Sequence, residues 1–483
     1  MENSKRIVFN LIWRFAERTG AQIITFLVTL VIARILEPED YGIIALIMVF
    51  ISILQVFVDS GLGNALIQKK NADDLDFSTV FFTNIVFCLC LYLLMFFMAP
   101  LIARFYENES LVLYIRVLSI IILISGVKNV QQAYVSRNML FKKFFFSTLG
   151  GTIISCVIGI IMAIKGFGVW ALISQQLLNL SIDTLILWLT VKWRPKLEFS
   201  FIRLKELFSF GSKLLISALI YTVEDNIRQL IIGKVYAPSE LAQYNRGKQI
   251  PSIVITNINS SIDSVLLPAM SREQDNSIRV KEMTRRAIKV STYVIAPLMI
   301  GLVFTAETLV KLILTDKWLP SVFFLRIFCI TFIFYPIHTA NLNAIKSLGR
   351  SDLFLKLEIY KNIVNIIALV STMFISVDAI AYSLLFTSVI SQVINSGPNK
   401  KLLEYSYLEQ IKDIMPIILI AVFMGVCIYP IKFLELPLLI ILVIQVIVGI
   451  LIYILASKIF KLDSYHYIVE MIKSIIKPKH NKE

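Results

Sequence analysis

The chain has 483 residues, of which 57% are hydrophobic and only 17% are charged, and its mean hydropathy is +0.77. Soluble chains have about 45–50% apolar and about 25% charged residues, so this composition excludes a secreted disulfide scaffold, a disordered chain and an ordinary cytosolic enzyme. It predicts an all-α polytopic membrane protein. In such a protein the net charge of +14 reports orientation and contact with anionic membrane lipids, and we expect no nucleic-acid partner.

About fourteen apolar runs have the length of about 20 residues that a helix needs to cross a bilayer. In chain order they cover residues 9–33, 42–66, 79–103, 111–133, 144–164, 168–190, 208–233, 242–267, 287–314, 322–344, 357–376, 379–397, 411–431 and 436–457. The connections between them are short and leave no large soluble domain for chemistry, so the function is expected to take place between helices.

Loop charge predicts the orientation of these spans. With the N-terminus in the cytoplasm, the cytoplasmic segments contain 30 lysines and arginines and the outer segments contain seven. This asymmetry follows the positive-inside rule and places both termini in the cytoplasm. Residues 458–483 form a basic amphipathic tail, for which a helix on the inner membrane surface and a solvated tail docked on the protein both remain open.

Two motifs recur along the chain and indicate an internal repeat. The loop Arg34-Ile-Leu-Glu-Pro-Glu-Asp-Tyr-Gly42 matches Lys234-Val-Tyr-Ala-Pro-Ser-Glu-Leu-Ala242 at an offset of 200 residues, and each has a proline, Pro38 or Pro238, at its centre. The R-x-x-L-F-x-K pattern of residues 137–143 recurs at residues 350–356, at an offset of 213. Six spans separate the copies, so both halves have the same orientation.

The repeat predicts two six-helix bundles around a central cavity, residues 1–200 and 201–405, joined by the connection 192–206. Two further transmembrane helices occupy residues 406–457 and precede the tail. Two bundles of this kind suit an alternating-access transporter, and a purely structural duplication is the alternative.

Ionisable residues inside spans cost about 2.5–3.5 kcal/mol each, so they mark candidate sites. The first and seventh spans each hold acids and arginine. For the first, snorkelling in the headgroup layer is the alternative, and for the seventh a local ion cluster. We assign substrate binding to Arg14, Arg18, Arg228, Arg246, Lys248 and Arg326, ion coupling to Glu17, Glu224 and Asp225, and structural or gating roles to Asp59, Gly61, Pro38 and Pro238. Lys128 and Asp183 are further polar positions in the first bundle.

Other chemistry-bearing residues give little support for catalysis. The cluster Asp73-Asp74-Leu75-Asp76 could hold Mg²⁺ on a diphosphate, as in a prenyltransferase, but no second acidic cluster exists, and a solvated loop capping the third span at Ser78 is the favoured interpretation. The five cysteines lie in apolar runs without C-x-x-C spacing, and the three histidines form no ligand set. We expect no metal, no cofactor and no enzymatic activity.

Several stretches resemble Wzx-type polysaccharide flippases, in particular the colanic-acid and teichuronic-acid exporter branch. The most specific are Ala33–Gly42 and Asp59–Gln68, followed by residues 211–215, 232–234 and 243–246 and by Leu348–Asp352. The similarity covers roughly residues 1–400. It implies the fold of the multidrug/oligosaccharidyl-lipid/polysaccharide exporter superfamily.

The resemblance further implies transport of an undecaprenyl-pyrophosphate-linked oligosaccharide from the cytoplasmic to the outer leaflet of a bacterial inner membrane. The polymerase and glycosyltransferases of the same pathway are candidate partners. Three alternatives stay open: an ion-coupled drug or small-molecule antiporter of the same fold, a flippase for a lipid-linked peptidoglycan precursor, and a membrane-embedded glycosyl- or prenyltransferase.

Overall fold

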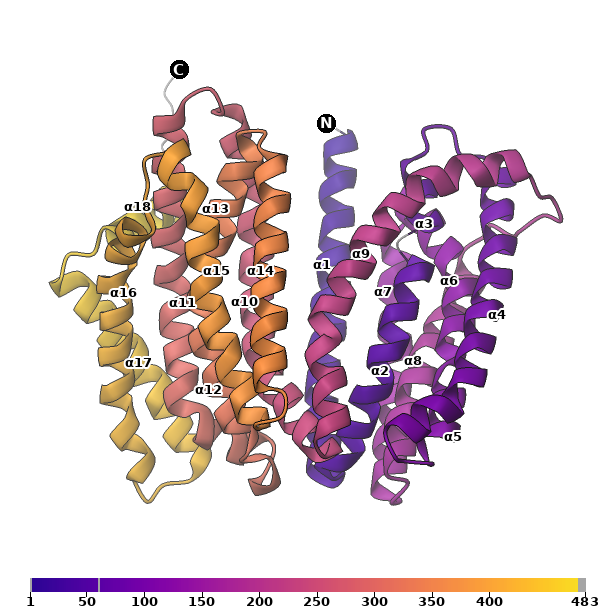
Figure 1. Cartoon of the computed structure of the whole chain (residues 1–483), viewed down its shortest axis with the longest axis horizontal. Helices are drawn as coiled ribbons and strands as arrows, with labels where there is room; N and C mark the ends of the chain where they lie inside the picture. Colours follow the sequence, from indigo (N-terminus) through magenta and orange to yellow (C-terminus); the bar gives the residue numbers. More distant parts are fainter. Residues whose placement is uncertain (1, 60, 477–483) are drawn as a thin grey trace. The chain divides into compact units, whose positions relative to one another are not determined.

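The computed structural model of the chain is built from helices (Figure 1). It describes the backbone of residues 2–59 and 61–476, and within these the side chains of all residues except 2–12, 14, 15, 209–211, 213, 214, 217, 471, 472 and 474–476. Every regular element in this part of the chain is a helix, as the composition predicted. The chain divides into two compact units, Met1–Ala242 and Gln243–Glu483, which are described one at a time.

The first unit contains nine helices within the described residues. They are α1 (Glu2–Ile35), α2 (Pro38–Asp59), α3 (Leu62–Gln68), α4 (Asp74–Phe105), α5 (Leu111–Leu118), α6 (Ile120–Arg137), α7 (Phe141–Ile164), α8 (Val169–Thr190) and α9 (Phe201–Val235). Helix α1 packs on α7, which packs on α8, while α4 packs on α6. Helix α9 packs against α2, α3 and α4, and for this reason it belongs to the first unit.

The second unit contains the remaining helices. They are α10 (Pro238–Arg272), α11 (Ser277–Ile313), the 3₁₀ turn η1 (Asp316–Trp318), α12 (Ser321–Phe332), α13 (Tyr335–Ser347), α14 (Ser351–Thr372), α15 (Val377–Leu402), α16 (Tyr407–Ile428), the 3₁₀ turn η2 (Tyr429–Phe433), α17 (Leu438–Ile459) and α18 (Asp463–Ile476). Helix α11 is the centre of this unit and contacts α12, α13, α16 and α17. The start of α18 is tied to it by an ion pair between Lys289 and Asp463 at 2.6 Å.

Within the described part of the chain, twelve helices or helix pairs are long and apolar enough to cross a membrane. The other two predicted spans, 208–233 and 357–376, lie in α9 and α14, which are 35 and 22 residues long. The pattern of exposed and buried side chains on α17 indicates which face of this helix meets lipid. Leu439, Val443 and Ile447 are exposed, whereas Gln445 is fully buried, which is the arrangement expected of a helix whose outer face meets lipid.

The order of long and broken helices repeats along the chain. Helices α1 and α9 are 34 and 35 residues long and end at Ile35 and Val235, and a proline then starts α2 and α10 at positions 38 and 238. Proline suits the first turn because its missing N–H has no partner there in any helix. The fourth span is broken in both copies, between α5 and α6 and between α12 and α13. The first recurring motif therefore occupies the same structural position in both copies.

The second recurring motif does not occupy equivalent positions. Arg137 is the last residue of α6, whereas Arg350 lies beyond the end of α13, at the residue that precedes α14. The guanidinium of Arg137 donates to the carbonyls of Leu66 and Lys70, and that of Arg350 pairs with Asp352 at 2.9 Å. The contact boundary at 242/243 also differs from the expected boundary at 200/201, because α9 packs on α2. The division into two six-helix bundles stays a proposal.

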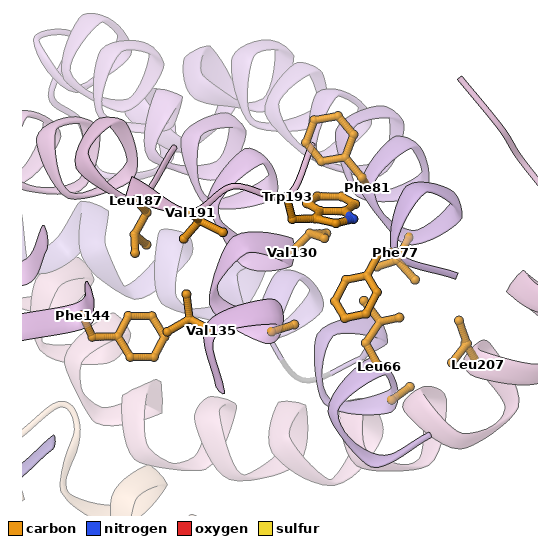
Figure 2. Packing of buried hydrophobic residues seen from close by; sticks show 13 residues of the cluster. Leu66, Phe77, Phe81, Val130, Val135, Phe144, Leu187, Val191, Trp193 and Leu207 are labelled. Atoms are coloured by element: carbon orange, nitrogen blue, oxygen red, sulfur yellow. The ribbon is translucent and has the colours of Figure 1, made fainter. Parts of the chain in front are cut away.

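An aromatic core holds one end of the first unit together (Figure 2). The ring of Trp193 lies 5.6 Å from that of Phe77 and 6.4 Å from that of Phe81, and all three side chains are buried. These rings join α4 to the segment that leads into α9. Each buried aromatic side chain of this size contributes about 1.5–3 kcal/mol when its alternative is water.

Candidate functional site

A buried ion pair lies inside the first unit, between α6 and α8. Lys128 Nζ and Asp183 Oδ2 are 2.6 Å apart, and their side chains are only 11% and 7% exposed. Helix α7 closes the space beside them, because a Cβ on Gly151 would lie 3.1 Å from the Cβ of Asp183. Removing a charged pair from water costs free energy, so a pair this far from solvent is a candidate for a functional role.

Two carboxamides join α6 to α2 and α4 at the position next to Lys128. Asn129, next to Lys128, accepts a hydrogen bond from Asn84 at 3.3 Å and donates one to the carbonyl of Val58 at 3.2 Å. Gly63 allows the close approach, since a Cβ there would lie 2.5 Å from the side-chain oxygen of Asn129. The neutral amides thus fix α2, α4 and α6 around a position that carries charge.

One carboxylate oxygen of the pair has no hydrogen-bond partner in the part of the chain that the structure describes. Asp183 Oδ1 is buried and has no hydrogen-bond partner among the described residues. Asp59, at the end of α2, interacts electrostatically with Lys128 and is a second acid for the same ammonium. The three residues Asp59, Lys128 and Asp183 are called here the ionic cluster.

Sequence reasoning noted Lys128 and Asp183 separately but did not join them. The available signal was one basic and one acidic residue in two apolar spans of the same bundle. Their separation of 55 residues along the chain is why the pairing could not be predicted.

The predicted residues of the first span lie on α1. Glu17 is buried and accepts a hydrogen bond from the Thr148 hydroxyl of α7 at 3.3 Å. Arg18 is exposed. The side chain of Arg14 lies outside the described residues. Glu17 thus faces the interior of the first unit rather than standing open to an ion path.

The predicted residues of the seventh span lie on α9, and Arg228 is the notable one. Its Nε and Nη2 nitrogens are buried and have no hydrogen-bond partner within the described part of the chain. Arg228 makes no ion pair within the described residues, although Glu224 precedes it by four residues on α9. Glu224 is partly exposed and Asp225 is exposed. Buried guanidinium nitrogens without an acceptor are destabilising, and a bound anion would supply the acceptor that these two nitrogens lack.

The three predicted cations of the second unit have other surroundings. Arg246 is buried, lies 4.7 Å from the ring centroid of Trp318 and donates to Gln249 at 2.7 Å. Arg326 donates to the carbonyl of Val303 at 3.2 Å. Lys248 is half-buried. Arg246 and Arg326 already have partners within the protein, which distinguishes them from Arg228.

The predicted structural positions mark helix ends. Asp59 accepts a hydrogen bond from Gln55 at 3.2 Å. At Gly61 the nearest atoms to an added Cβ are 3.9 Å away. The glycine that a neighbouring side chain approaches closely is therefore Gly63 and not Gly61. Pro38 and Pro238 start their helices, and the Pro238 backbone lies directly against Gly42.

Several buried polar side chains of the second unit hydrogen-bond to one another. Asn341 donates to Gln410 at 2.7 Å and accepts from Asn399 at 2.6 Å, which joins α13, α15 and α16. His338 lies 2.8 Å from Asn395. No group of three or more His, Cys, Asp and Glu residues suitable for a metal occurs within the described residues.

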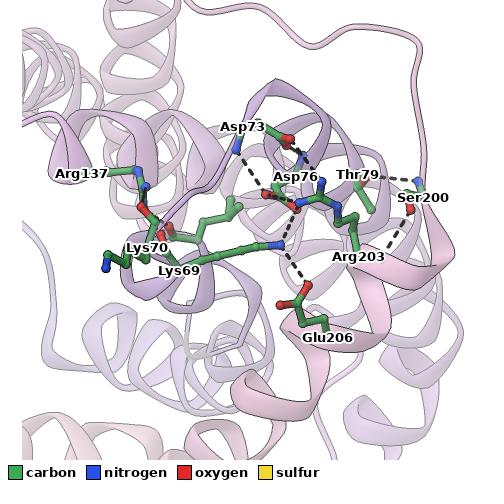
Figure 3. A network of polar contacts seen from close by, with 10 residues as sticks. Lys69, Lys70, Asp73, Asp76, Thr79, Arg137, Ser200, Arg203 and Glu206 are labelled. Atoms are coloured by element: carbon green, nitrogen blue, oxygen red, sulfur yellow. Dashed lines mark hydrogen bonds and ion pairs between the residues drawn. The ribbon is translucent and has the colours of Figure 1, made fainter.

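The acidic motif at the start of α4 ties this helix to α9 by ion pairs, and is called here the clamp (Figure 3). Asp76 is fully buried and pairs with Lys69 at 3.0 Å and with Arg203 at 3.2 Å. Asp73, and not Ser78 as expected, caps α4 in a capping box with Asp76. A hydrogen bond from the Asp76 backbone, and then the Arg203 charge, lower the pKa of Asp73. Burial opposes it, but hydrogen bonds to Asp76 and Glu206 raise the pKa of Lys69.

We expect Asp76→Asn to destabilise the first unit by about 3 kcal/mol, because Lys69 and Arg203 would lose their buried counter-charge. The thermal unfolding midpoint in detergent should fall by roughly 6 °C or more. Asp74→Asn is the matched control, since the Asp74–Lys196 pair is 51% and 57% exposed and contributes little. Equal midpoints for the two variants would contradict the clamp.

A comparison with known proteins identifies relatives. The family model described as polysaccharide biosynthesis protein matches residues 31–323. The teichuronic acid biosynthesis protein TuaB of Bacillus subtilis is 31% identical over 306 residues, which are 62% of each chain. The succinoglycan biosynthesis transport protein ExoT of Rhizobium meliloti is 23% identical over 65% of this chain and 64% of its own. The chain thus spans less than two thirds of the length of these two relatives.

Solved structures show the same fold. The lipid II flippase MurJ, in an inward closed conformation, has a TM-score of 0.73 at 18% identity and covers 93% of this chain and 98% of its own. An inward-facing multidrug resistance MATE transporter has a TM-score of 0.62 at 15% identity, over 84% and 98%. The fold class and the family resemblance expected from the sequence are both confirmed.

Proposed function

We propose that this chain, which belongs to the polysaccharide biosynthesis protein family, is a flippase that moves a lipid-linked saccharide between the leaflets of a membrane. The substrate would be an undecaprenyl-pyrophosphate-linked oligosaccharide, carried from the cytoplasmic to the outer leaflet of a bacterial inner membrane for cell-surface polysaccharide synthesis. The names of TuaB and ExoT and the fold of MurJ support this class of function.

Arg228 is the observation that carries the proposal. A pyrophosphate headgroup supplies the acceptor oxygens that its buried nitrogens lack, and arginine binds phosphate in a bidentate manner. Arg14, Arg18 and Lys248 would add positive charge along the path. Arg246 and Arg326 would contribute only if they exchanged their present partners, so we rank them below Arg228.

The mechanism would be alternating access between two six-helix bundles, residues 1–200 and 201–405, around a basic cavity. The lipid tail stays in the bilayer while the headgroup crosses. With cytoplasmic termini and a negative interior, exporting two negative charges gains roughly 4–5 kcal/mol per 100 mV.

Ion coupling would use the ionic cluster. Asp183 is buried, one of its oxygens has no hydrogen-bond partner among the described residues, and its ion-pair partner Lys128 has a flexible side chain. Glu17, in contrast, accepts a hydrogen bond from Thr148. Glu224 and Asp225 stay as second candidates, and all four acids lie in membrane-spanning helices. Proton uptake by Asp183 would transfer Lys128 toward Asp59.

Reconstituted protein tests the role of Arg228. Proteoliposomes loaded with undecaprenyl-pyrophosphate-linked oligosaccharide are assayed for glycan that becomes accessible to an added glycosidase. We expect Arg228→Met to slow its appearance by about tenfold or more, the effect of one lost charge-assisted contact. Its unfolding midpoint should stay equal or rise, because the variant removes an unpaired buried charge.

Arg104→Ala is the control, since this arginine is exposed at the end of α4. It should transport at the wild-type rate. Wild-type transport by Arg228→Met, or a slow rate that merely follows a lowered midpoint, would remove Arg228 from the substrate path.

A further inference from the structure

A cavity of about 390 Å³ opens at one end of the first unit, apart from the ionic cluster. Its walls are the first turns of α2, the connection between α4 and α5, and the last residues of α9 with the segment that follows. The side chains that give it chemical character are Glu39, Tyr106, Glu107, Glu109, Lys234 and Tyr236. The volume lies within the usual range of about 300–1,000 Å³ for small-ligand sites.

The walls are fixed by contacts between α4 and α9. Tyr106 Oη donates to the carbonyl of Leu230 at 3.3 Å, and its ring lies 6.3 Å from that of Phe50. Lys234 donates to the carbonyl of Phe105 and pairs with Glu107 at 3.0 Å. Burial raises the pKa of Tyr106 to about 12, so this wall presents a neutral phenol ring.

The charge of the cavity is negative. Three carboxylates and one ammonium line it, so its net charge is −2. Glu107 and Lys234 offset each other, while Glu39 and Glu109 have no ion-pair partner among the described residues. A negative cavity repels phosphates and uronate carboxylates, and its carboxylates accept hydrogen bonds from hydroxyl and ammonium groups. Two tyrosines offer apolar faces with polar tips.

We propose that this cavity binds a neutral or amino-bearing hexose unit of the transported saccharide and discriminates against acidic sugars. The assignment to a transported saccharide rests on the proposed function, but the sugar selectivity follows from the cavity alone. Its charge is opposite to that proposed for the headgroup path, so sugar and pyrophosphate would be recognised at separate places. With cytoplasmic termini, the cavity lies at the outer end of the first unit and would receive the sugar after its crossing.

Saturation-transfer NMR on the full-length protein in phosphatidylcholine nanodiscs tests the selectivity. The probes are glucosamine, N-acetylglucosamine, glucuronate and inorganic pyrophosphate. We expect glucosamine and N-acetylglucosamine to bind more tightly than glucuronate. The double variant Glu39→Gln, Glu109→Gln should weaken glucosamine binding by about fivefold, the scale of exposed charge contacts, and leave pyrophosphate binding unchanged. Glu198→Gln, at the opposite end of the unit, should bind as the wild type does.

Equal glucosamine binding by the wild type and the double variant would overturn the proposal, and so would a preference for glucuronate. The transport assay separates this failure from that of the proposed function. Transport without sugar selectivity at Glu39 and Glu109 removes only the cavity assignment. If the protein binds sugars selectively but transports no lipid-linked saccharide, the cavity remains a sugar-binding site and the proposed flippase function is wrong.

Discussion

Asp183→Asn is expected to lower the stability of the first unit by about 3–5 kcal/mol, because it removes the carboxylate that is ion-paired with the buried ammonium of Lys128. The unfolding midpoint in detergent should fall by roughly 6 °C or more. The same variant should lose transport driven by a proton gradient, since the acid proposed to take up the proton is gone.

A second variant separates the two effects. In Lys128→Met, Asp183→Leu both charges are replaced by apolar groups of similar volume, a change that is often neutral or stabilising for a buried pair. We expect its midpoint to return to that of the wild type or higher while transport stops responding to the proton gradient. A doubly substituted protein that still responds to the gradient would show that the ionic cluster is structural.

Gly42→Ala is the second change with a large expected effect. An added Cβ would lie 1.8 Å from the carbonyl oxygen of Pro238 and 2.3 Å from its carbonyl carbon, so backbone must move. Helix α2 and the start of α10 would separate, at a cost of about 3 kcal/mol or more. The measurement is the yield of monodisperse protein extracted from membranes, together with its unfolding midpoint.

Gly301→Ala is the matched control, because the nearest atom to an added Cβ at that position in α11 is Cε of the flexible Met424 side chain, 3.9 Å away. Alanine in a helix interior is favoured over glycine by about 0.8–1 kcal/mol, so this variant should be slightly more stable than the wild type. A Gly42→Ala protein as stable as the wild type would mean that α2 and Pro238 do not touch.

Sequence patterns predicted the helices and the start of each repeat well, for physical reasons. Long apolar runs have few alternatives to helix in a membrane, and Pro38 and Pro238 suit the first turn of a helix in both copies. The R-x-x-L-F-x-K match was a weaker guide. Arg137 satisfies carbonyls at the end of α3, 67–71 residues away, and nothing in the motif itself specifies those partners.

The site was less predictable because its charges are paired across distant segments. Arg246 carries the same charge as Arg228 but stacks on Trp318, whereas the buried nitrogens of Arg228 have no acceptor in the described chain. Lys128 and Asp183 became a candidate site only when α6 and α8 were placed together. The Asp73 cap was also missed, since Asp73 and Ser78 are both suitable residue types for the start of a helix.

The central claim is that the chain moves a lipid-linked saccharide between leaflets without altering it. The most direct test places labelled undecaprenyl-pyrophosphate-linked oligosaccharide in the inner leaflet of proteoliposomes containing the wild-type chain, then follows glycosidase access and the mass of the lipid together. The proposal predicts protein-dependent access to the glycan and an unchanged mass before glycosidase is added. A changed mass, or access no faster than in protein-free vesicles, would contradict it.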